Sequence, residues 1–531
     1  MSKAKERAAR SVPMQQLLKG LAVTGPELEG KEISGIICDS RKVFAGCLFV
    51  AVQGLTVDGH DFLDIAATKG CGAVVVNAGR CRDWNHPETP CVEVADTRLA
   101  LGRIATEFYG NPAERLVVVG ITGTNGKTTT TYLLESVIRR SGGNPGVIGT
   151  VNYRYNDVVM DSPFTTPDPV LLQKILADMV SAGVTHVVME VSSHALEQKR
   201  VAGMEFDVAL FTNLTRDHLD FHGSMESYYA SKKRLFAEHL KGKGKAVVIT
   251  EPDAVAGRDW GKRLTRELLA EQKRKKGPVK MRIIECGFTG EEISILEAQH
   301  SLDGIQARIA TPEGELKLRS GLVGRFNLKN LLGAFGVGVA LGFSKGSILQ
   351  GLEEACAAPG RLERVKSKAG VGVFVDYAHT PDALENVLQT LRGVCSGRLF
   401  VVFGCGGDRD RGKRPLMGKV AGLHADVVVL TSDNPRSEKP EAILAEIESG
   451  IMETAMPRMR LECLMHCNEL SGYDIIVSRR EAIRAVARHA EAGDVVAICG
   501  KGHETYQITC EGKIFFDDRV EAELASAFIN W

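Results

Sequence analysis

The chain has 531 residues, enough for about three domains that each bury a core. Its 66 Lys and Arg balance 66 Asp and Glu, so no overall charge favours nucleic acid or a membrane surface as a partner. The first ten residues are basic, and no apolar stretch follows that would form a signal peptide or cross a bilayer.

The thirteen cysteines are irregularly spaced and form no C-x-x-C pair. This pattern indicates reduced, mostly buried thiols in a cytoplasmic protein. We also expect the chain to be a monomer without membrane insertion.

Residues 1–112 mix short strands with loops. Alternating apolar positions at 37–41 and 46–52 predict a small sheet, and Asn111-Pro112 breaks the chain after it. We therefore predict a small mixed α/β domain over residues 1–112.

Residues 113–357 alternate apolar strands with helical stretches, which is typical of a doubly wound α/β domain. A helix is expected over residues 169–182. The charged stretch 259–282 favours a solvated helix over a nucleic-acid patch. Buried parallel strands are expected at residues 147–149, 186–189, 208–211 and 246–249.

A second boundary falls at Pro359-Gly360, and residues 358–531 predict a Rossmann-like α/β domain. Helices should begin near Pro381, Arg414 and Pro440. The stretch 452–473 is expected to form an extra helix or loop. Strands are predicted at 371–376, 399–405, 425–431 and 495–500.

The most informative motif lies at residues 120–131, which read Gly-Ile-Thr-Gly-Thr-Asn-Gly-Lys-Thr-Thr-Thr-Thr after the apolar run 116–119. Glycines allow a tight turn that directs N–H groups at phosphate oxygens. Lys127 can reach the β- and γ-phosphates, and Thr128 can offer a hydroxyl to Mg²⁺. Ile121 replaces the first glycine of the strict P-loop pattern. The strand before and the amphipathic helix after it nevertheless favour a nucleotide site over an ordinary turn.

Polar clusters follow the predicted strands of both larger domains. Glu190-Val-Ser-Ser-His and residues 212–220 follow strands of the central domain. Four more clusters, at 376–379, 406–410, 433–436 and 500–504, follow strands of the last domain. Because the carboxyl ends of parallel strands share one edge of a sheet, each set predicts a ligand crevice.

These motifs together resemble the Mur ligase family, which is an ATP-dependent family of amide-forming enzymes in peptidoglycan synthesis. The resemblance covers nearly the whole chain, from Asp39 to Glu504. The motifs that carry it are Gly123-Thr-Asn-Gly-Lys-Thr-Thr, Glu190-Val-Ser-Ser-His, Asn213-Leu-Thr-Arg-Asp-His-Leu-Asp, Gly324-Arg-Phe-Asn-Leu-Lys-Asn330, Gly360-Arg-Leu-Glu, Asp376-Tyr-Ala-His-Thr-Pro, Gly404-Cys-Gly-Gly-Asp-Arg-Asp, Asp433-Asn-Pro-Arg and Gly500-Lys-Gly-His-Glu.

The resemblance implies ATP and Mg²⁺ as cofactors. It implies catalytic roles for Lys127, Glu190, His218 and Lys232, and a metal site formed by Thr128, Glu190, His218 and Lys232, with Lys232 carbamylated. The residues that it implies for the nucleotide are Gly123, Thr124, Asn125, Gly126, Lys127, Thr128, Thr129, Asn327, Asn330, Arg361 and Asp376. From the residues alone, Lys232 could equally be a solvated helix lysine.

The resemblance further implies UDP-N-acetylmuramoyl-L-Ala-D-Glu and meso-diaminopimelate as substrates. For the uridine side it implies Cys38, Ser40, Leu55, Thr56 and Val57, and for the muramoyl-dipeptide it implies Thr165, Thr166, Ser192, Gln198 and Arg200. Phe164 replaces a residue that is often polar in the family, so no role is transferred to it. The amino-acid pocket would comprise Arg409, Asp433, Asn434, Pro435, Arg436, Gly500 and Glu504.

The choice of amino acid has a physical argument. Diaminopimelate differs from lysine by one carboxylate, and the planar guanidinium of Arg436 suits that carboxylate. Lysine would leave Arg436 unpaired and facing another cation. Three alternatives remain: a ligase that uses lysine, a folylpolyglutamate synthetase, and a nucleotide-gated binding protein without turnover.

Overall fold

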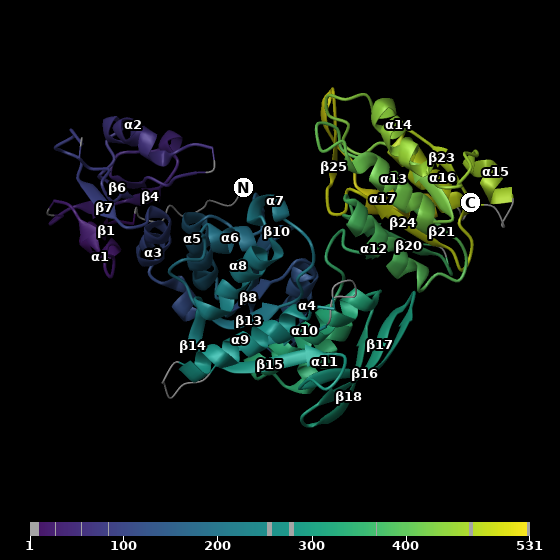
Figure 1. The fold of residues 1–531 in the computed structure, drawn as a ribbon, viewed down its shortest axis with the longest axis horizontal. Helices are drawn as coiled ribbons and strands as arrows, with labels where there is room; N and C mark the ends of the chain where they lie inside the picture. Colours follow the sequence, from purple (N-terminus) through teal and green to yellow (C-terminus); the bar gives the residue numbers. More distant parts are fainter. Residues whose placement is uncertain are drawn as a thin grey trace. The chain divides into compact units, whose positions relative to one another are not determined.

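The computed structural model describes residues 10–26, 28–54, 56–82, 84–251, 257–274, 281–367, 369–466 and 471–527. Figure 1 draws them as a ribbon coloured along the sequence. Their contacts divide the chain into two compact units. The first unit comprises residues 1–127, 138–286 and 336–344, and the second comprises 128–137, 287–335 and 345–531. The predicted three-domain boundaries stay a prediction.

The N-terminal part of the first unit contains a five-stranded sheet, with the strand order β2-β7-β6-β5-β4. All its pairs are parallel except β2 with β7. Asp96 caps the helix α3 by accepting hydrogen bonds from the N–H groups of Arg98 and Leu99. The elements are β1 (Val12–Pro13), α1 (Met14–Leu17), β2 (Val23–Thr24), β3 (Glu32–Ile33), β4 (Gly35–Ile37), β5 (Cys47–Val50), α2 (Leu63–Thr68), β6 (Ala73–Asn77), β7 (Cys91–Val94) and α3 (Thr97–Phe108).

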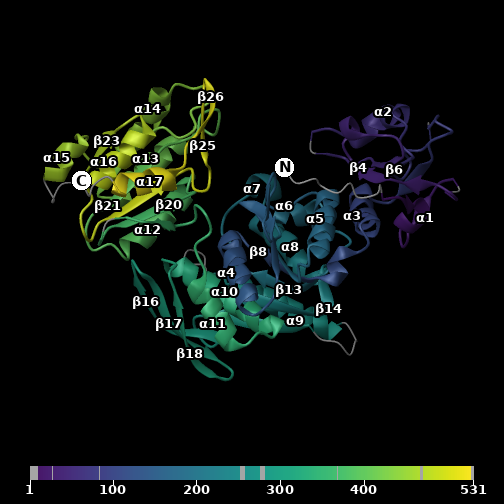
Figure 2. The same cartoon turned by 180° about the vertical axis from the view of Figure 1, so that it is seen from behind.

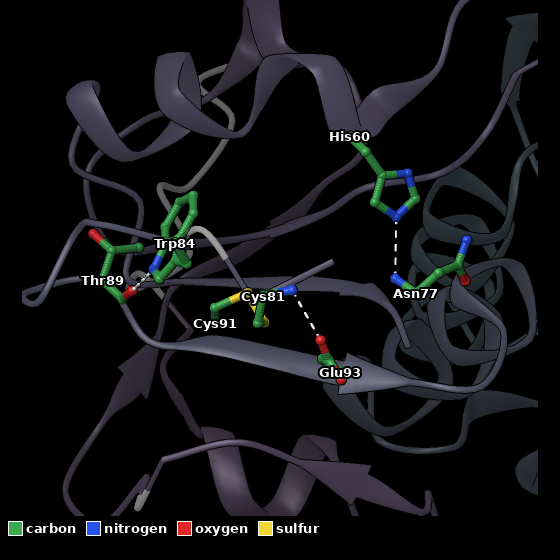
Figure 3. Close-up of a disulfide and its surroundings, with 7 residues drawn as sticks. All are labelled: His60, Asn77, Cys81, Trp84, Thr89, Cys91 and Glu93. Carbon is green, nitrogen blue, oxygen red and sulfur yellow. Dashed lines mark hydrogen bonds between the residues drawn. A yellow bond between two sulfur atoms is a disulfide. The ribbon is translucent and has the colours of Figure 1, made fainter. Parts of the chain in front are cut away.

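A disulfide in this part overturns one prediction. Cys81 and Cys91 are bonded, so the expectation of reduced thiols is wrong for this pair (Figure 3). The bond ties the residues after β6 to the first residue of β7, and Trp84 Nε1 donates to the Thr89 carbonyl inside the closed loop. The pairing depends on two parallel strands lying side by side, which ten-residue spacing in the sequence does not reveal.

The central part of the first unit is built on a mainly parallel sheet, with the order β11-β10-β9-β12-β8-β13-β14-β15 in this unit. Every strand predicted here is present, and β12 pairs with both β8 and β9 in parallel. The elements are β8 (Val117–Thr122), β9 (Pro145–Ile148), β10 (Asn152–Tyr155), β11 (Val158–Asp161), α5 (Pro169–Ser181), β12 (His186–Glu190), α6 (Ser193–Glu197), β13 (Phe206–Phe211), α7 (Leu219–His222), α8 (Met225–Ala237), β14 (Leu240–Ile249), α9 (Trp260–Arg274) and β15 (Arg282–Gly287). The helix α4 (Lys127–Arg140) follows β8, and its residues 128–137 belong to the second unit.

Two helices of this part show how local sequence sets the fold. Asp168 caps α5 with its side chain and Pro169 occupies the first helical position, the pattern that favours a helix start. Of the charged stretch 259–282, residues 260–274 form the predicted helix as α9, with Trp260, Leu264 and Leu268 buried on one face. Residues 275–280 lie outside the described residues, and Arg282 begins β15 instead. The helix α9 is therefore amphipathic, with its charges on the other face.

The second unit contains a six-stranded sheet of order β19-β20-β24-β21-β22-β23, parallel apart from β19. Alternate strand residues face two separate cores: α12, α13 and α14 pack on one face, and α15, α16 and α17 on the other. The elements are α11 (Lys345–Glu354), β19 (Glu363–Val365), β20 (Gly372–Asp376), α12 (Pro381–Arg392), β21 (Leu399–Phe403), α13 (Lys413–His424), β22 (Val427–Leu430), α14 (Pro440–Ile451), α15 (Leu461–His466), β23 (Gly472–Ile475), α16 (Arg479–His489), β24 (Val495–Cys499), β25 (Tyr506–Thr509), β26 (Gly512–Phe515) and α17 (Asp518–Ala527).

The same unit contains features that the sequence did not predict. Strands β16 (Ile293–Ser301), β17 (Gly304–Thr311) and β18 (Gly314–Ser320) form an antiparallel ladder, visible in Figure 2. The helix α10 (Arg325–Leu341) follows it, and its residues 336–341 belong to the first unit. Arg479 and Asp518 form an ion pair at 2.6 Å with neither side chain exposed. The predicted α/β class, doubly wound in the central and C-terminal regions, is confirmed.

Candidate active site

The predicted phosphate loop lies between the end of β8 and the start of α4. Gly123 has φ +149° and Gly126 has φ +86°, both in the region that favours glycine. A Cβ at Gly123 would lie 1.9 Å from Thr212 Oγ1, so only glycine fits against the neighbouring loop. The N–H groups of Thr124 and Asn125 donate to oxygens of Asn213. The polar segment after β13 therefore holds the loop in place.

Two lysines converge on this loop. Lys127 Nζ donates to the carbonyls of Gly123 (2.9 Å) and Thr124 (2.8 Å), while Lys232 Nζ donates to the Gly123 carbonyl at 2.8 Å. Lys232 is 1% exposed. Burial, helped by the charge of Lys127, lowers the pKa of Lys232 well below that of an ordinary lysine. The alternative that Lys232 is a solvated helix lysine is therefore wrong. Lys232 therefore lies buried against the predicted phosphate loop, where its charged form is disfavoured.

Glu190 ends the strand β12, in register with Ile121 of the strand that leads into the phosphate loop. The carboxylate is buried and accepts hydrogen bonds from Thr150 N–H (2.9 Å) and Thr150 Oγ1 (3.0 Å). These bonds fix its orientation. Thr150 was not predicted as a site residue, since nothing in its local sequence links it to Glu190.

His218 lies in the segment after β13 and has φ +52°, a backbone conformation that histidine adopts more readily than most residues do. Its Nε2 is 3.3 Å from Asp217 Oδ2, and its ring meets the ring of His194 edge-on at 4.8 Å. Thr128 and Thr129 are buried in the first turn of α4. Among the described residues, no group of three or more His, Cys, Asp and Glu side chains could by itself hold a metal ion.

The residues predicted for the muramoyl-dipeptide lie together. Thr166 Oγ1 donates to the Glu190 carbonyl (2.9 Å) and accepts from Ser192 N–H (3.1 Å). Arg200 donates to the Thr166 carbonyl (2.8 Å) and to Gln198 Oε1 (2.8 Å). Together these bonds tie the end of β12, both ends of α6 and the segment before α5 into a single polar surface.

Two further residues complete that surface. Thr165 Oγ1 lies 3.1 Å from Thr150 Oγ1. The Arg200 guanidinium lies over the Phe164 ring at 4.9 Å, which gives the unassigned Phe164 a contact with the cluster. Thr165 thereby reaches the threonine that holds Glu190.

The residues predicted for the uridine side lie after two neighbouring parallel strands. Cys38 and Ser40 follow β4, and Thr56 and Val57 occupy an exposed turn after β5. Gly54 N–H donates to the Val57 carbonyl at 2.8 Å and closes that turn. Leu55 lies outside the described residues.

In the second unit, the residues predicted for the nucleotide form two pairs. Asn330 Nδ2 donates to Asn327 Oδ1 at 3.0 Å within the helix α10. Asp376 accepts from Leu362 N–H and Ala378 N–H, while burial raises the pKa of its carboxyl group and the charge of Arg361 opposes that rise. The Arg361 guanidinium lies 5.2 Å from the centre of the Tyr377 ring.

The predicted amino-acid pocket gathers at the ends of β21, β22 and β24. Asn434 Nδ2 donates to Glu504 Oε2 at 2.9 Å, and Arg436 Nη1 donates to the Gly407 carbonyl at 2.7 Å. Arg436 has φ +53°. A Cβ at Gly406 would lie 2.9 Å from Arg436 Nη1, so this glycine makes room for the guanidinium.

The other members of the pocket differ in exposure. Asp433 and Pro435 are buried, and Gly500 lies beside the Asp433 carboxylate. Arg409 is exposed, and its Nη1 donates to the Asp408 carbonyl within its own loop. Arg409 is therefore the predicted pocket residue that is least fixed by its surroundings.

A hairpin formed by β25 and β26 fixes the 433–436 loop. Gln507 Nε2 donates to the Asp433 carbonyl (2.6 Å), Ile508 N–H donates to Asn434 Oδ1 (2.9 Å), and Arg436 N–H donates to the Ile508 carbonyl (3.1 Å). This role of Gln507 was not predicted from the sequence. The one sequence signal for this role was the closeness of Tyr506-Gln507 to the Gly-Lys-Gly-His-Glu motif, which ends two residues before Tyr506.

A glycine-rich loop between a strand and a helix, a buried lysine that contacts this loop, a fixed glutamate and a second polar cluster at the ends of β21, β22 and β24 are the features that we expect of a nucleotide-dependent ligase. Three family models match the chain: the Mur ligase family catalytic domain at residues 32–109, the Mur ligase middle domain at 121–338, and the Mur ligase glutamate ligase domain at 360–502. The chain belongs to the Mur ligase family.

Named relatives agree with this assignment. The chain is 47% identical over 503 residues to the UDP-N-acetylmuramoyl-L-alanyl-D-glutamate–2,6-diaminopimelate ligase of Geobacter metallireducens, covering 94% of each chain. It is 42% identical to the ligase of that name from Geobacillus kaustophilus, over 93% of this chain and 95% of the relative. A solved structure of a ligase with that name aligns with TM-score 0.70 and 32% identity, over 98% of this chain and all of that one.

Proposed function

We propose that this chain is an ATP-dependent ligase that adds meso-diaminopimelate to the D-Glu side-chain carboxylate of UDP-N-acetylmuramoyl-L-Ala-D-Glu. The observation that carries the proposal is the identity of 47% with a ligase of that name over 94% of both chains. The site geometry supports it, because the polar surfaces around Glu190 and Arg436 suit an anionic sugar-peptide and a dicarboxylic amino acid.

The reaction needs activation because a carboxylate is a poor electrophile. The γ-phosphoryl group of ATP passes to the D-Glu carboxylate to give an acyl phosphate and ADP. The amine of diaminopimelate then attacks the acyl carbon, and phosphate leaves as the amide forms. Lys127 and the loop N–H groups bind and orient the phosphates, so catalysis rests on positioning and on neutralising charge.

The donor set near the loop fits Mg²⁺, which takes one or two carboxylates and completes its shell with water and phosphate. Glu190 offers one buried carboxylate held by Thr150. His218 and a carbamylated Lys232 would complete the set. When bound, the ion would neutralise charge on the transferred phosphoryl group.

Selection of the amino acid rests on Arg436. Its backbone N–H and Nη1 are both engaged, so the side chain is held in one place, and a guanidinium pairs with a carboxylate through two parallel hydrogen bonds. Lysine lacks the second carboxylate and brings an unbalanced positive charge. Discrimination against it should therefore be large.

The test is phosphate release from ATP with UDP-N-acetylmuramoyl-L-Ala-D-Glu, adding meso-diaminopimelate or L-lysine in parallel and checking the product mass. Turnover with diaminopimelate alone is expected, and Arg436→Ala should lose it. Lys439→Ala, which removes an exposed cation three residues away, should behave as wild type.

Other outcomes are informative as well. Turnover with lysine would contradict the proposed role of Arg436, but it would still support a ligase reaction. ATP binding without turnover on either amino acid would contradict the proposed function itself and favour a binding protein.

We also propose that the chain acts in the cytoplasm as a monomer. In the part of the chain that the structure describes, no helix is both long and apolar enough to cross a membrane. Size-exclusion chromatography with light scattering tests the monomer, and fractionation of cells tests the location.

A further inference from the structure

Lys501 is a buried cation inside the amino-acid pocket that none of the assigned roles uses. Its side chain is 0% exposed. Lys501 Nζ lies 3.4 Å from Asp433 Oδ1, 3.1 Å from Asn434 Oδ1 and 3.4 Å from Glu504 Oε2. A single ammonium group therefore contacts three side chains of the predicted pocket.

The backbone around Lys501 directs the side chain inward. Gly500 has φ +113° and Gly502 has φ +53°, so both neighbours adopt conformations that favour glycine. A Cβ at Gly502 would lie 2.6 Å from Tyr377 Cβ and 2.8 Å from Tyr377 Cα, which no side chain there can avoid. This tight turn keeps Lys501 beneath the pocket rather than in solvent.

The position has an electrostatic consequence. Without the ammonium group, the carboxylates of Asp433 and Glu504 would lose the positive charge that contacts both of them, and their mutual repulsion would be less compensated. Asn434 links both sides, because its Oδ1 accepts from Lys501 while its Nδ2 donates to Glu504. Lys501 therefore sets the spacing of these three groups.

Lys501 also changes the charge that a substrate meets. The five charged side chains of the pocket are Arg409, Arg436 and Lys501 on the positive side, and Asp433 and Glu504 on the negative side. Their sum is one positive charge. That balance favours an amino acid with two carboxylates over lysine, which carries one net positive charge.

We infer that Lys501 is a positioning residue for the amino-acid substrate: it holds Asp433, Asn434 and Glu504 in the arrangement that binds a diamino dicarboxylic acid, and it contributes to the rejection of lysine. This inference rests on the proposed function and deepens it, because it adds a selectivity determinant beside Arg436. It does not place Lys501 in contact with the reacting atoms.

The experiment compares Lys501→Met with Lys513→Met in the full-length enzyme. Both lysines lie near the Tyr506 ring, Lys501 at 5.7 Å and the exposed Lys513 at 3.7 Å, so Lys513→Met is a matched control. Steady-state phosphate release is measured while each substrate is varied in turn, with L-lysine as a competing amino acid.

For Lys501→Met, the KM for diaminopimelate should rise roughly 30-fold or more, since truncating one partner of a buried charge pair has effects of this order. The KM values for ATP and the UDP-sugar dipeptide should stay within about twofold, and the preference for diaminopimelate over lysine should shrink. Lys513→Met should match wild type. A structural role alone would instead shift all three KM values or only the unfolding temperature.

If the Lys501→Met variant does not fold, Lys501→Arg tests the same inference. It keeps the charge and changes the shape, so the KM for diaminopimelate should rise while the preference over lysine is retained. An unchanged KM for diaminopimelate in either folded variant would overturn the inference, and so would a parallel rise of the KM for all substrates. In both cases, turnover by the wild-type enzyme would still support the proposed function. A wild-type enzyme that is inactive with diaminopimelate would overturn the proposed function and the inference together.

Discussion

Breaking the bond between Cys81 and Cys91 should destabilise the N-terminal five-stranded sheet. The bond closes a ten-residue loop between β6 and β7. In the chain-entropy model, releasing a loop of that size from its constraint stabilises the unfolded state by about 2.7 kcal/mol. The hydrogen bonds from Trp84 to Thr89 and from Cys81 N–H to Glu93 can persist without the bond, so the effect should come mainly from the unfolded chain.

The assay is urea unfolding of the double variant Cys81→Ala, Cys91→Ala, followed by hydrogen exchange of the β6 and β7 amides. With a urea dependence of about 1–3 kcal/mol per molar, the midpoint should fall by about 1–3 M. The double variant Cys356→Ala, Cys510→Ala removes two exposed free thiols and should leave the midpoint unchanged. An unchanged midpoint in the first variant would refute the loop-entropy argument. Twelve or more reactive thiols in unfolded, unreduced wild type would refute the disulfide itself.

Three further predictions follow from packing and charge. Gly102→Val should lower the free energy of unfolding by about 1–3 kcal/mol by calorimetry, because a Cβ there lies 2.5 Å from the Ala202 carbonyl oxygen; a neutral effect would contradict this close approach. Asp518→Ala should lower the free energy of unfolding by about 3–5 kcal/mol, because it leaves the buried Arg479 without its carboxylate partner. A decrease below about 1 kcal/mol would refute that estimate. Hydrogen bonds from Arg414 lower the pKa of Glu438 from 4.5 to about 2, so this stabilisation is complete above pH 4.5 and is lost as the pH falls towards 2. In acid unfolding, the free energy of unfolding of Glu438→Gln should therefore fall less steeply than that of wild type between pH 4.5 and about 2. Identical curves for the two proteins would show that the pair of Arg414 and Glu438 contributes nothing to stability.

The sequence correctly predicted those features that depend on interactions between residues close together in the chain, such as backbone turns and helix caps. The P-loop lies between a strand and a helix because Gly123 and Gly126 supply the required backbone angles, and α5 begins where Asp168 and Pro169 start a helix. The carboxyl ends of the parallel strands also bring Asn434 and Glu504 together, although 70 residues separate them.

Long-range partners were not accessible from the sequence. The hydrogen bonds from Thr150 to Glu190 and the disulfide between Cys81 and Cys91 depend on which strands lie side by side. The ladder of β16, β17 and β18 was missed because helix-bearing α/β regions were expected throughout residues 113–357. Lys501 was quoted within a motif, but only burial reveals its role.

The hairpin of β25 and β26 has a consequence for engineering this family. Three hydrogen bonds between the hairpin residues Gln507 and Ile508 and the loop 433–436 determine the path of that loop, so the Asp-Asn-Pro-Arg motif and the hairpin behave as one structural unit. Transplanting the four motif residues into a ligase that has a different hairpin should transfer the side chains without their geometry. A working exchange of amino-acid preference would need both segments to move together.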